Sequence, residues 1–231
     1  MSMPRGVARP SGPRMSPNSP LEHLLNFGFA AGAAKETRQA LARECRPLDL
    51  RPRERVPADR VSFVASGHAK FVTVLESGDE HIANFIWPGG WCAPAAEEQG
   101  ALVALSRCLI FTFTPETFFG IINSDRDGIR SVLDALVEQV QDQRAHAATV
   151  SCLSAGEKIE RFLNKLATER GVRDTAGIRL TLPMSRADIG NHLGLTIETV
   201  SRCMAQLQRS GAISFPSRRE VVFLPQAEAA P

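Results

Sequence analysis

Three side chains in one stretch of this 231-residue chain have types and spacing suited to reading the edges of base pairs. Glu198, Ser201 and Arg202 would lie within about one turn of a helix. An arginine can donate two hydrogen bonds to guanine O6 and N7, a glutamate can accept one from cytosine N4, and a serine can do either. Taken alone, a Glu and an Arg four residues apart are more often a salt bridge on a solvated helix. Base recognition therefore depends on whether the surrounding elements present this helix to a groove of DNA.

Residues 185–211 predict two short helices joined by a tight turn. Ser185 is expected to cap the first helix, with Asp188 as its capping-box partner, and Gly194 is expected to end it. Thr196 is expected to cap the second helix, which should end near Gly211. The residues expected to face inward are Ile189 and Leu193 in the first helix and Val200, Met204 and Leu207 in the second. The outward face would carry Glu198, Ser201, Arg202, Ala205 and Arg209, an arrangement typical of a helix-turn-helix whose second helix reads the major groove.

The sequence DIGNHLGLTIETVSR in this stretch closely resembles the DNA-reading unit of the CRP/FNR family of bacterial transcription regulators. Within that family it is similar to the FNR and FixK branch, which carries E-x-x-S-R where this chain has Glu198, Ser201 and Arg202. The cyclic-AMP-responsive branch has an arginine where this chain has Ile197. The resemblance is dense over residues 185–211, and the layout of residues 21–224 agrees with it.

The resemblance implies a homodimeric, sequence-specific transcription regulator that acts as an activator and is not an enzyme. Each recognition helix would enter a major groove of a palindromic DNA operator with TTGA-type half-sites about one helical turn apart. Arg202 would contact the guanine and Glu198 the opposite strand. The phosphates would be contacted by Ser185, Thr196, Thr199, Arg218 and Arg219, although the serine and the two threonines could instead act only as helix caps. Residues 171–177, a polar and exposed loop by composition, would touch RNA polymerase.

The whole chain predicts an α+β fold with four successive regions. Residues 1–20 are rich in proline and arginine and should form a disordered leader. Residues 21–124 predict a helix and then a β-roll or jelly roll of short strands, among them 60–66, 70–76, 81–87 and 109–113. Residues 125–150 predict a long dimerisation helix. Residues 151–231 predict a winged helix-turn-helix domain, with a helix after the capping box of Ser154 and Glu157, a strand at 178–182, and two strands flanking Ser217, Arg218 and Arg219 as the wing.

The helix expected at 125–150 carries a heptad repeat that predicts a dimer. Its seam residues are spaced 4-3-4-3-4-3: Ile129, Leu133, Leu136, Val140, Gln143, Ala147 and Val150. A seam of this length indicates a parallel pair of helices in a homodimer. The polar Gln143 would favour one register, and Val132 and Val137 would pack on the roll from the flanks. The alternative is a single helix buried against its own domain.

Composition and charge fit an ordinary globular protein and by themselves indicate no nucleic-acid partner. The chain has 43% hydrophobic and 23% charged residues and a net charge of +2. Residues 151–231 hold 11 Lys and Arg against 8 Asp and Glu, and the rest of the chain holds 16 against 17. This excess has the sign expected for a DNA-binding half, but it is a weak signal. Because no signal peptide or long apolar stretch is present, the chain is expected in the cytoplasm, without a membrane partner.

The cysteine pattern and the ligand positions of the family favour a regulator without a cofactor. The five cysteines are Cys45, Cys92, Cys108, Cys152 and Cys203, and none forms the C-x-x-C of a zinc ribbon. None precedes Cys45, so the N-terminal iron–sulfur cluster of the FNR branch is expected to be missing. The cyclic-nucleotide branch binds its ligand with a Gly-Glu pair and a later Arg-Ser or Arg-Thr pair. This chain has Ala93 and Pro94, and Ala101 and Leu102, near those places, so cyclic nucleotide is not expected to bind.

The sequence also allows two other functions and one regulatory site. A ligand- or haem-gated regulator of the same fold would need a site in the roll, for which the candidates are His68, His81, Cys92 and Cys108. An enzyme with a cysteine nucleophile would need a histidine and an orienting acid as well, and no local signature indicates that trio. Cys203 follows Arg202 near a helix N-terminus, so its oxidation would add negative charge beside the phosphates. The simpler interpretation of Cys203 is a small apolar filler in the helix core.

Overall fold

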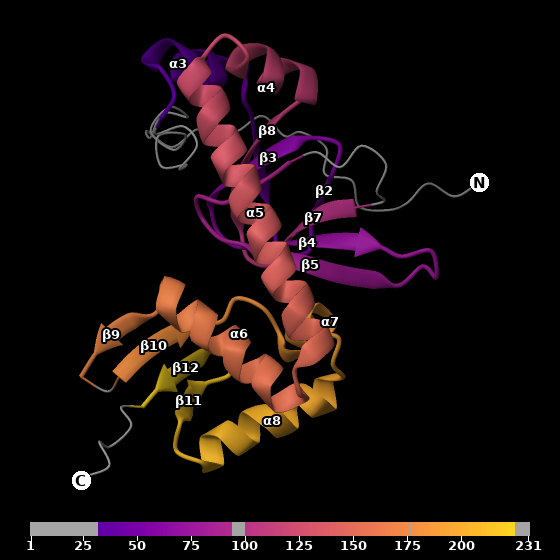
Figure 1. The fold of residues 1–231 in the computed structure, drawn as a ribbon, viewed down its shortest axis with the longest axis vertical. Coiled ribbons are helices and arrows are strands. Elements are labelled where there is room, and N and C mark those ends of the chain that lie inside the picture. Colours follow the sequence, from indigo (N-terminus) through magenta and orange to yellow (C-terminus); the bar gives the residue numbers. More distant parts are fainter. Residues whose placement is uncertain (1–31, 94–99, 176, 225–231) are drawn as a thin grey trace. The chain divides into compact units, whose positions relative to one another are not determined.

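The computed structural model describes residues 32–93, 100–175 and 177–224, and it divides into two compact units between Gln141 and Asp142 (Figure 1). The leader expected at 1–20, the helical residues expected at 21–31, and Pro94 lie outside the described residues. Each unit combines helices with antiparallel sheets, which confirms the predicted α+β fold.

The first unit is built on two four-stranded antiparallel sheets of short strands. One contains β1 (Arg46–Leu50), β8 (Cys108–Phe113), β3 (Val61–Ser66) and β6 (Trp91–Cys92), in that order across the sheet. The other contains β2 (Arg55–Pro57), β7 (Gly100–Ala104), β4 (Ala69–Val74) and β5 (Glu80–Ile86). The strands expected at 60–66, 70–76, 81–87 and 109–113 are therefore confirmed as β3, β4, β5 and β8.

An aromatic core lies against the first of these sheets. Phe63, Phe111 and Phe113 are at most 2% exposed, and the ring of Phe63 stacks on Trp91 with centroids 5.9 Å apart. The turn between β3 and β4 lies close to the backbone of Arg107 at Gly67, whose φ is +80°. A Cβ at this position would lie 2.1 Å from the carbonyl oxygen of Arg107. Only glycine fits this turn without a shift of the backbone.

One carboxylate links the starts of two helices of the first unit. This unit contains α3 (Lys35–Glu44), α4 (Pro115–Ile122) and the first part of α5 (Arg126–Cys152). Asp125 Oδ1 accepts the backbone N–H of Gly128 at 3.0 Å in the first turn of α5, and Oδ2 accepts that of Ala34 at 2.6 Å, next to the start of α3. These bonds, above all the one from Gly128, hold the pKa of the Asp125 carboxyl below its ordinary value.

The long helix predicted at 125–150 is present as α5, and its heptad residues differ in exposure. Val132 is 5% exposed, and Ile129 and Leu136 are half-buried against the same core. The most exposed apolar residues of the helix are Leu133 at 56%, Val137 at 55% and Val140 at 46%. The packing predicted for Val132 is confirmed, whereas that for Val137 is wrong, because only one flank of the seam faces the core of the unit. Leu133 and Val140 of the predicted seam are therefore not covered by their own unit in the single chain, and the dimer stays a prediction.

The second unit has the elements expected of a winged helix-turn-helix domain. Its sheet contains β11 (Ile213–Ser217), β12 (Glu220–Phe223), β10 (Gly177–Thr181) and β9 (Val172–Asp174), in that order. Its helices, after the end of α5, are α6 (Ala155–Arg170), α7 (Arg186–Leu193) and α8 (Ile197–Arg209). The expected capping box of Ser154 and Glu157 is present at the start of α6, with the Glu157 carboxylate accepting the Ser154 N–H at 2.8 Å.

The loop predicted at 171–177 is wrong in its secondary structure, because residues Val172–Asp174 form the edge strand β9. The strand pairs antiparallel with β10, placing Arg173 opposite Ile178 and Asp174 opposite Gly177. The Arg179 guanidinium also pairs with the Asp174 carboxylate at 3.0 Å across this hairpin. A three-residue strand shows too little alternation to be recognised from sequence. The expected exposure is confirmed, since all three residues of β9 are exposed.

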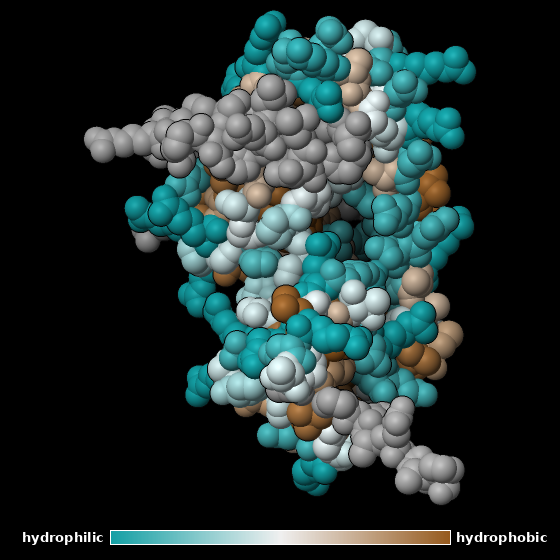
Figure 2. Space-filling view, turned by 90° about the vertical axis from the view of Figure 1, so that its left-hand side faces the viewer, coloured by the Kyte–Doolittle hydropathy of each residue, from teal (hydrophilic) through white to brown (hydrophobic). Residues whose placement is uncertain are grey.

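Hydrophilic side chains predominate on the face of the molecule shown in Figure 2, and hydrophobic ones occur there in small separate groups. Within the described part of the chain, no helix combines the length and the apolar character required to cross a membrane.

Candidate nucleic-acid interface

The first helix of the helix-turn-helix, α7, begins and ends at the residues predicted from the sequence. Ser185 and Asp188 form a reciprocal capping box, in which the Asp188 N–H donates to Ser185 Oγ at 3.1 Å and the Ser185 N–H to Asp188 Oδ2 at 2.9 Å. Gly194 ends the helix in the left-handed conformation, with φ +65°. A Cβ on Gly190 would lie 2.6 Å from the carbonyl oxygen of Leu195. The turn can therefore pack closely on α7 because position 190 has no side chain.

The second helix, α8, is capped by Thr196, whose Oγ1 accepts the N–H of Thr199 at 3.2 Å. Val200 and Met204 are at most 1% exposed, as predicted for the inward stripe. Leu207 is only half-buried, and the third buried position is Cys203 at 8% exposed. The inward stripe is thus rotated slightly from the predicted one.

The outward face of α8 carries the predicted base-reading residues in an accessible arrangement. Glu198, Arg202, Ala205 and Arg209 are exposed, and Ser201 is half-buried. Glu198 and Arg202 form no ion pair with each other among the contacts of the described residues, although they lie four positions apart. The salt-bridge alternative therefore does not account for this pair. Both charged groups are available to a ligand at the N-terminal half of the helix.

Sequence reasoning missed Arg186, which the structure places beside the recognition helix. Its Nη1 donates to Ser201 Oγ at 3.4 Å, and its guanidinium lies 5.7 Å from the centre of the Phe215 ring. The exposed side chain of Arg186, in α7, therefore contacts both α8 and β11. An arginine directly after a helix cap was the only local signal, because the contact depends on how the two helices cross.

The wing presents two arginines at its tip. Arg218 and Arg219 are exposed between β11 and β12. Arg219 is fixed through its backbone, since its N–H donates to Ser217 Oγ at 3.3 Å and its carbonyl oxygen accepts the N–H of Leu182 at 2.7 Å. Both guanidinium groups can then reach a phosphate without a change in the hairpin.

Comparison with known proteins identifies the family. A model of the Crp-like helix-turn-helix domain matches residues 157–229. The nitrogen fixation regulation protein FixK of Azorhizobium caulinodans is 31% identical over 170 residues, which cover 72% of this chain and 68% of that protein. This chain belongs to the CRP/FNR family of transcription regulators. The regulatory protein HlyX of Actinobacillus pleuropneumoniae is 32% identical over 156 residues, 65% of each chain. The solved structure of FixK2 from Bradyrhizobium japonicum has the same fold, with a TM-score of 0.69 at 24% identity, over 80% of this chain and 99% of that one.

As a CRP/FNR protein, the chain is a transcription regulator with a helix-turn-helix DNA-binding domain, and the FixK-like relatives confirm the branch inferred from the E-x-x-S-R pattern. The fold predicted for this family is confirmed as well: a β domain, a long helix and a C-terminal winged helix-turn-helix. DNA is therefore the ligand of the second unit.

The residues considered for a haem or metal site, His68, His81, Cys92 and Cys108, are not among any group of metal ligands in the described part of the chain. No group of three or more His, Cys, Asp or Glu in the described ranges is placed to hold a metal ion. The ring of His68 contacts Trp87 edge-on, with centroids 4.9 Å apart, and the Cys108 thiol donates to the His68 carbonyl at 3.0 Å. Burial raises the pKa of the Cys108 thiol and raises that of Cys92 to about 12. These two thiols stay protonated at neutral pH, which makes them poor ligands and poor nucleophiles.

Two other positions considered in the sequence take ordinary structural places. Leu102, near the place of the family's second nucleotide-binding pair, is 2% exposed in β7 and belongs to the core of the roll. Cys203 is part of the buried stripe of α8 rather than of its edge. Oxidation of Cys203 would therefore first require α8 to loosen, and redox control at this thiol stays a prediction.

Proposed function

We propose that this protein is a homodimeric activator of transcription that reads a palindrome with TTGA-type half-sites and has no catalytic activity. The observation that carries this proposal is the pair Glu198 and Arg202, exposed and not bonded to each other on a capped α8. Arg202 donates to guanine O6 and N7, and Glu198 accepts from a cytosine on the opposite strand. Ser201, held by Arg186, completes the base-facing turn of the helix.

The phosphate contacts come from groups around α8. Candidates that the structure leaves exposed are Arg186, Arg209, Arg218 and Arg219. The hydroxyl groups of Ser185, Thr196 and Thr199 already serve the two helix caps and their N-terminal turns. Ser185 Oγ donates its proton to Asp188 Oδ2 at 2.7 Å, and Thr196 Oγ1 donates its proton to Thr199 Oγ1 at 3.2 Å. These two residues would have to give up those bonds to bind a phosphate, whereas the Thr199 hydroxyl can donate to a phosphate oxygen while it accepts from Thr196.

Dimerisation through α5 explains its exposed apolar residues. Leu133 and Val140 lie on the heptad seam and are about half exposed in the single chain, at 56% and 46%. A parallel partner helix would bury them together with Ile129 and Leu136, while Gln143 and Ala147 extend the seam through the second unit. Two recognition helices in a two-fold dimer then match the two halves of a palindrome.

RNA polymerase is the proposed partner of the β9–β10 hairpin. Val172 is 68% exposed at one edge of the described sheet, next to the exposed Arg173. An apolar side chain on a free edge strand is a feature of contact surfaces. Such a contact would make the regulator an activator, acting in the cytoplasm where the polymerase works.

A binding titration tests the proposal directly. The full chain is titrated against a TTGAT-N4-ATCAA duplex and a duplex of the same composition with scrambled half-sites, each with and without reductant. We expect affinity for the palindrome at least about a thousandfold above the scrambled duplex at the same salt concentration. Equal affinity for both duplexes would refute sequence-specific reading of this palindrome.

A further inference from the structure

The heptad register of α5 places one apolar residue where a charged one is expected. With Leu133 and Val140 at a positions and Ile129 and Leu136 at d, the e positions are Arg130, Val137 and Arg144. The e and g positions of a two-stranded coil usually carry charged side chains, which pair across the interface. Val137 breaks this pattern between two arginines, and it is 55% exposed in the single chain.

The g position that pairs with position 137 of the partner helix is residue 132, and it is apolar too. In a parallel coil a g residue lies beside the e residue of the next heptad on the partner helix, so the partner's Val137 would lie beside position 132, where Val132 packs mainly on the core of its own unit. The corresponding pair one heptad later is Gln139 with the partner's Arg144, which is polar. The two positions that the register would bring together, 132 and the partner's 137, are thus both apolar, whereas the next such pair is polar.

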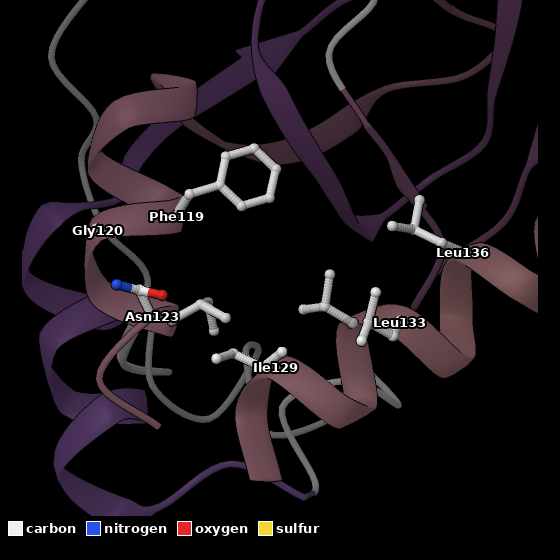
Figure 3. A pocket seen from close by; sticks show the side chains of 8 residues that line it. Phe119, Gly120, Asn123, Ile129, Leu133 and Leu136 are labelled. Atoms are coloured by element: carbon white, nitrogen blue, oxygen red, sulfur yellow. The ribbon is translucent and has the colours of Figure 1, made fainter. Parts of the chain in front are cut away.

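A groove opens on the g flank of α5, at the place where the register puts this pair. It lies between α4 and α5, has a volume of about 480 Å³, and Phe119, Val132 and Leu133 are among its lining residues (Figure 3). Val132 is 5% exposed, whereas Phe119 and Leu133 are 44% and 56% exposed. Phe119 is fixed at the wall by the buried Phe118, with ring centroids 5.3 Å apart. Val137 does not line the groove of its own chain.

We propose that the partner's Val137 inserts into this groove, against Phe119 and Val132, in both halves of the dimer. The dimer interface therefore extends beyond the heptad seam to α4, and a second copy of this chain is the occupant of the groove. Two-fold symmetry makes the contact twice, so that both exposed valines and both exposed phenyl rings are buried. The inference rests on the parallel pairing of α5 in the proposed function.

Cross-linking tests the contact. Phe119→Cys and Val137→Cys are combined in one chain in a Cys152→Ser background, which removes the native cysteine that is exposed among the described residues. A disulfide forms only when the two Cβ atoms approach within about 4.5 Å, so mild oxidation should give a covalent dimer. The matched control combines Phe119→Cys with Glu138→Cys, one residue further along α5 and exposed. We expect about tenfold less covalent dimer from the control, because Glu138 points away from the partner.

A second measurement needs no cross-link. Phe119→Ala should raise the dissociation constant of the dimer by about tenfold, as truncation of an aromatic residue that becomes buried in an interface does. Leu75→Ala, on a residue that is 50% exposed elsewhere in the same unit, should leave the constant unchanged. Analytical ultracentrifugation gives both values and shows whether each variant is folded and compact.

The outcomes separate this inference from the proposed function. If the wild type is a dimer but the 119–137 cysteine variant gives no more covalent dimer than its control, or Phe119→Ala leaves the dissociation constant unchanged, the groove contact is overturned and the proposed dimer stands. A wild-type chain that is monomeric at all concentrations would overturn both.

Discussion

Arg186 Nη1 donates a hydrogen bond to Ser201 Oγ at 3.4 Å, which links the first turn of α7 to the base-facing turn of α8. The two helices of the helix-turn-helix therefore present their polar side chains as one surface. Ser201 contacts the arginine on one side and lies next to Arg202 on the other. Removing Arg186 should disturb both the proposed phosphate contact of its guanidinium and the orientation of Ser201, a proposed base-reading residue.

Base reading and phosphate binding should respond differently to substitution. Arg202→Ala should weaken binding to the palindrome by about 1–3 kcal/mol and relax the preference at the guanine, because a bidentate contact is lost. Arg219→Ala should weaken binding to all sequences alike and reduce the salt slope by about one. Titrations at several salt concentrations on specific and scrambled duplexes measure both effects. An equal loss for both variants on both duplexes would show that these roles are wrong.

Ile197 should read a thymine methyl group. It is the first residue of α8, is 46% exposed, and precedes Glu198, which we propose to read a base, so an apolar contact in the major groove is available to it. Replacing the half-site thymines one at a time by uracil removes only the methyl group. At one position the substitution should weaken binding of the wild-type protein by about 0.8 kcal/mol, the value for one buried CH₂ group. Ile197→Ala should bind the thymine and uracil duplexes equally, and a wild type indifferent to every uracil would exclude the contact.

Leu136→Lys should prevent dimerisation. The substitution brings two positive charges together at a d position of the seam, where they cannot be solvated in a dimer. Light scattering should report a monomer, and affinity for the palindrome should fall to that for a single half-site. Asp134→Lys, at an exposed position off the seam, is the control. A Leu136→Lys chain that stays dimeric would place the dimer interface elsewhere.

Asp125→Ala should destabilise the first unit by about 0.5–2 kcal/mol, as loss of a helix cap does. Because the folded pKa of Asp125 lies below its ordinary 3.8, its contribution is present above that value and is lost as pH falls through the folded pKa. The variant should therefore lose less stability in acid than the wild type does. Denaturant unfolding at neutral and acidic pH measures both effects, with Asp127→Ala as the control. A variant with wild-type stability and acid dependence would show that the hydrogen bonds of Asp125 contribute nothing to stability.

The sequence predicted the helix-turn-helix well because its signals are local. Ser185, Gly194 and Thr196 act within their own turns, and the structure has each in its expected place. Pairing across the chain was harder to predict. The strand at Val172–Asp174 exists only through its partner β10, and the contact of Arg186 with Ser201 depends on helix crossing. The exposure of Val137 was missed for the same reason, since periodicity defines a face of a helix but not which flank meets the core.

The position of β9 at the edge of its sheet limits what alanine scanning of this strand can detect. The main-chain N–H and C=O groups on the outer side of an edge strand can pair with another chain, and side-chain substitutions leave them unchanged. A partner that binds β9 through its backbone would therefore escape detection in a scan that replaces Val172, Arg173 and Asp174 by alanine. Only a residue that alters the main chain itself, such as proline, would reveal that contact, because it deletes an amide hydrogen.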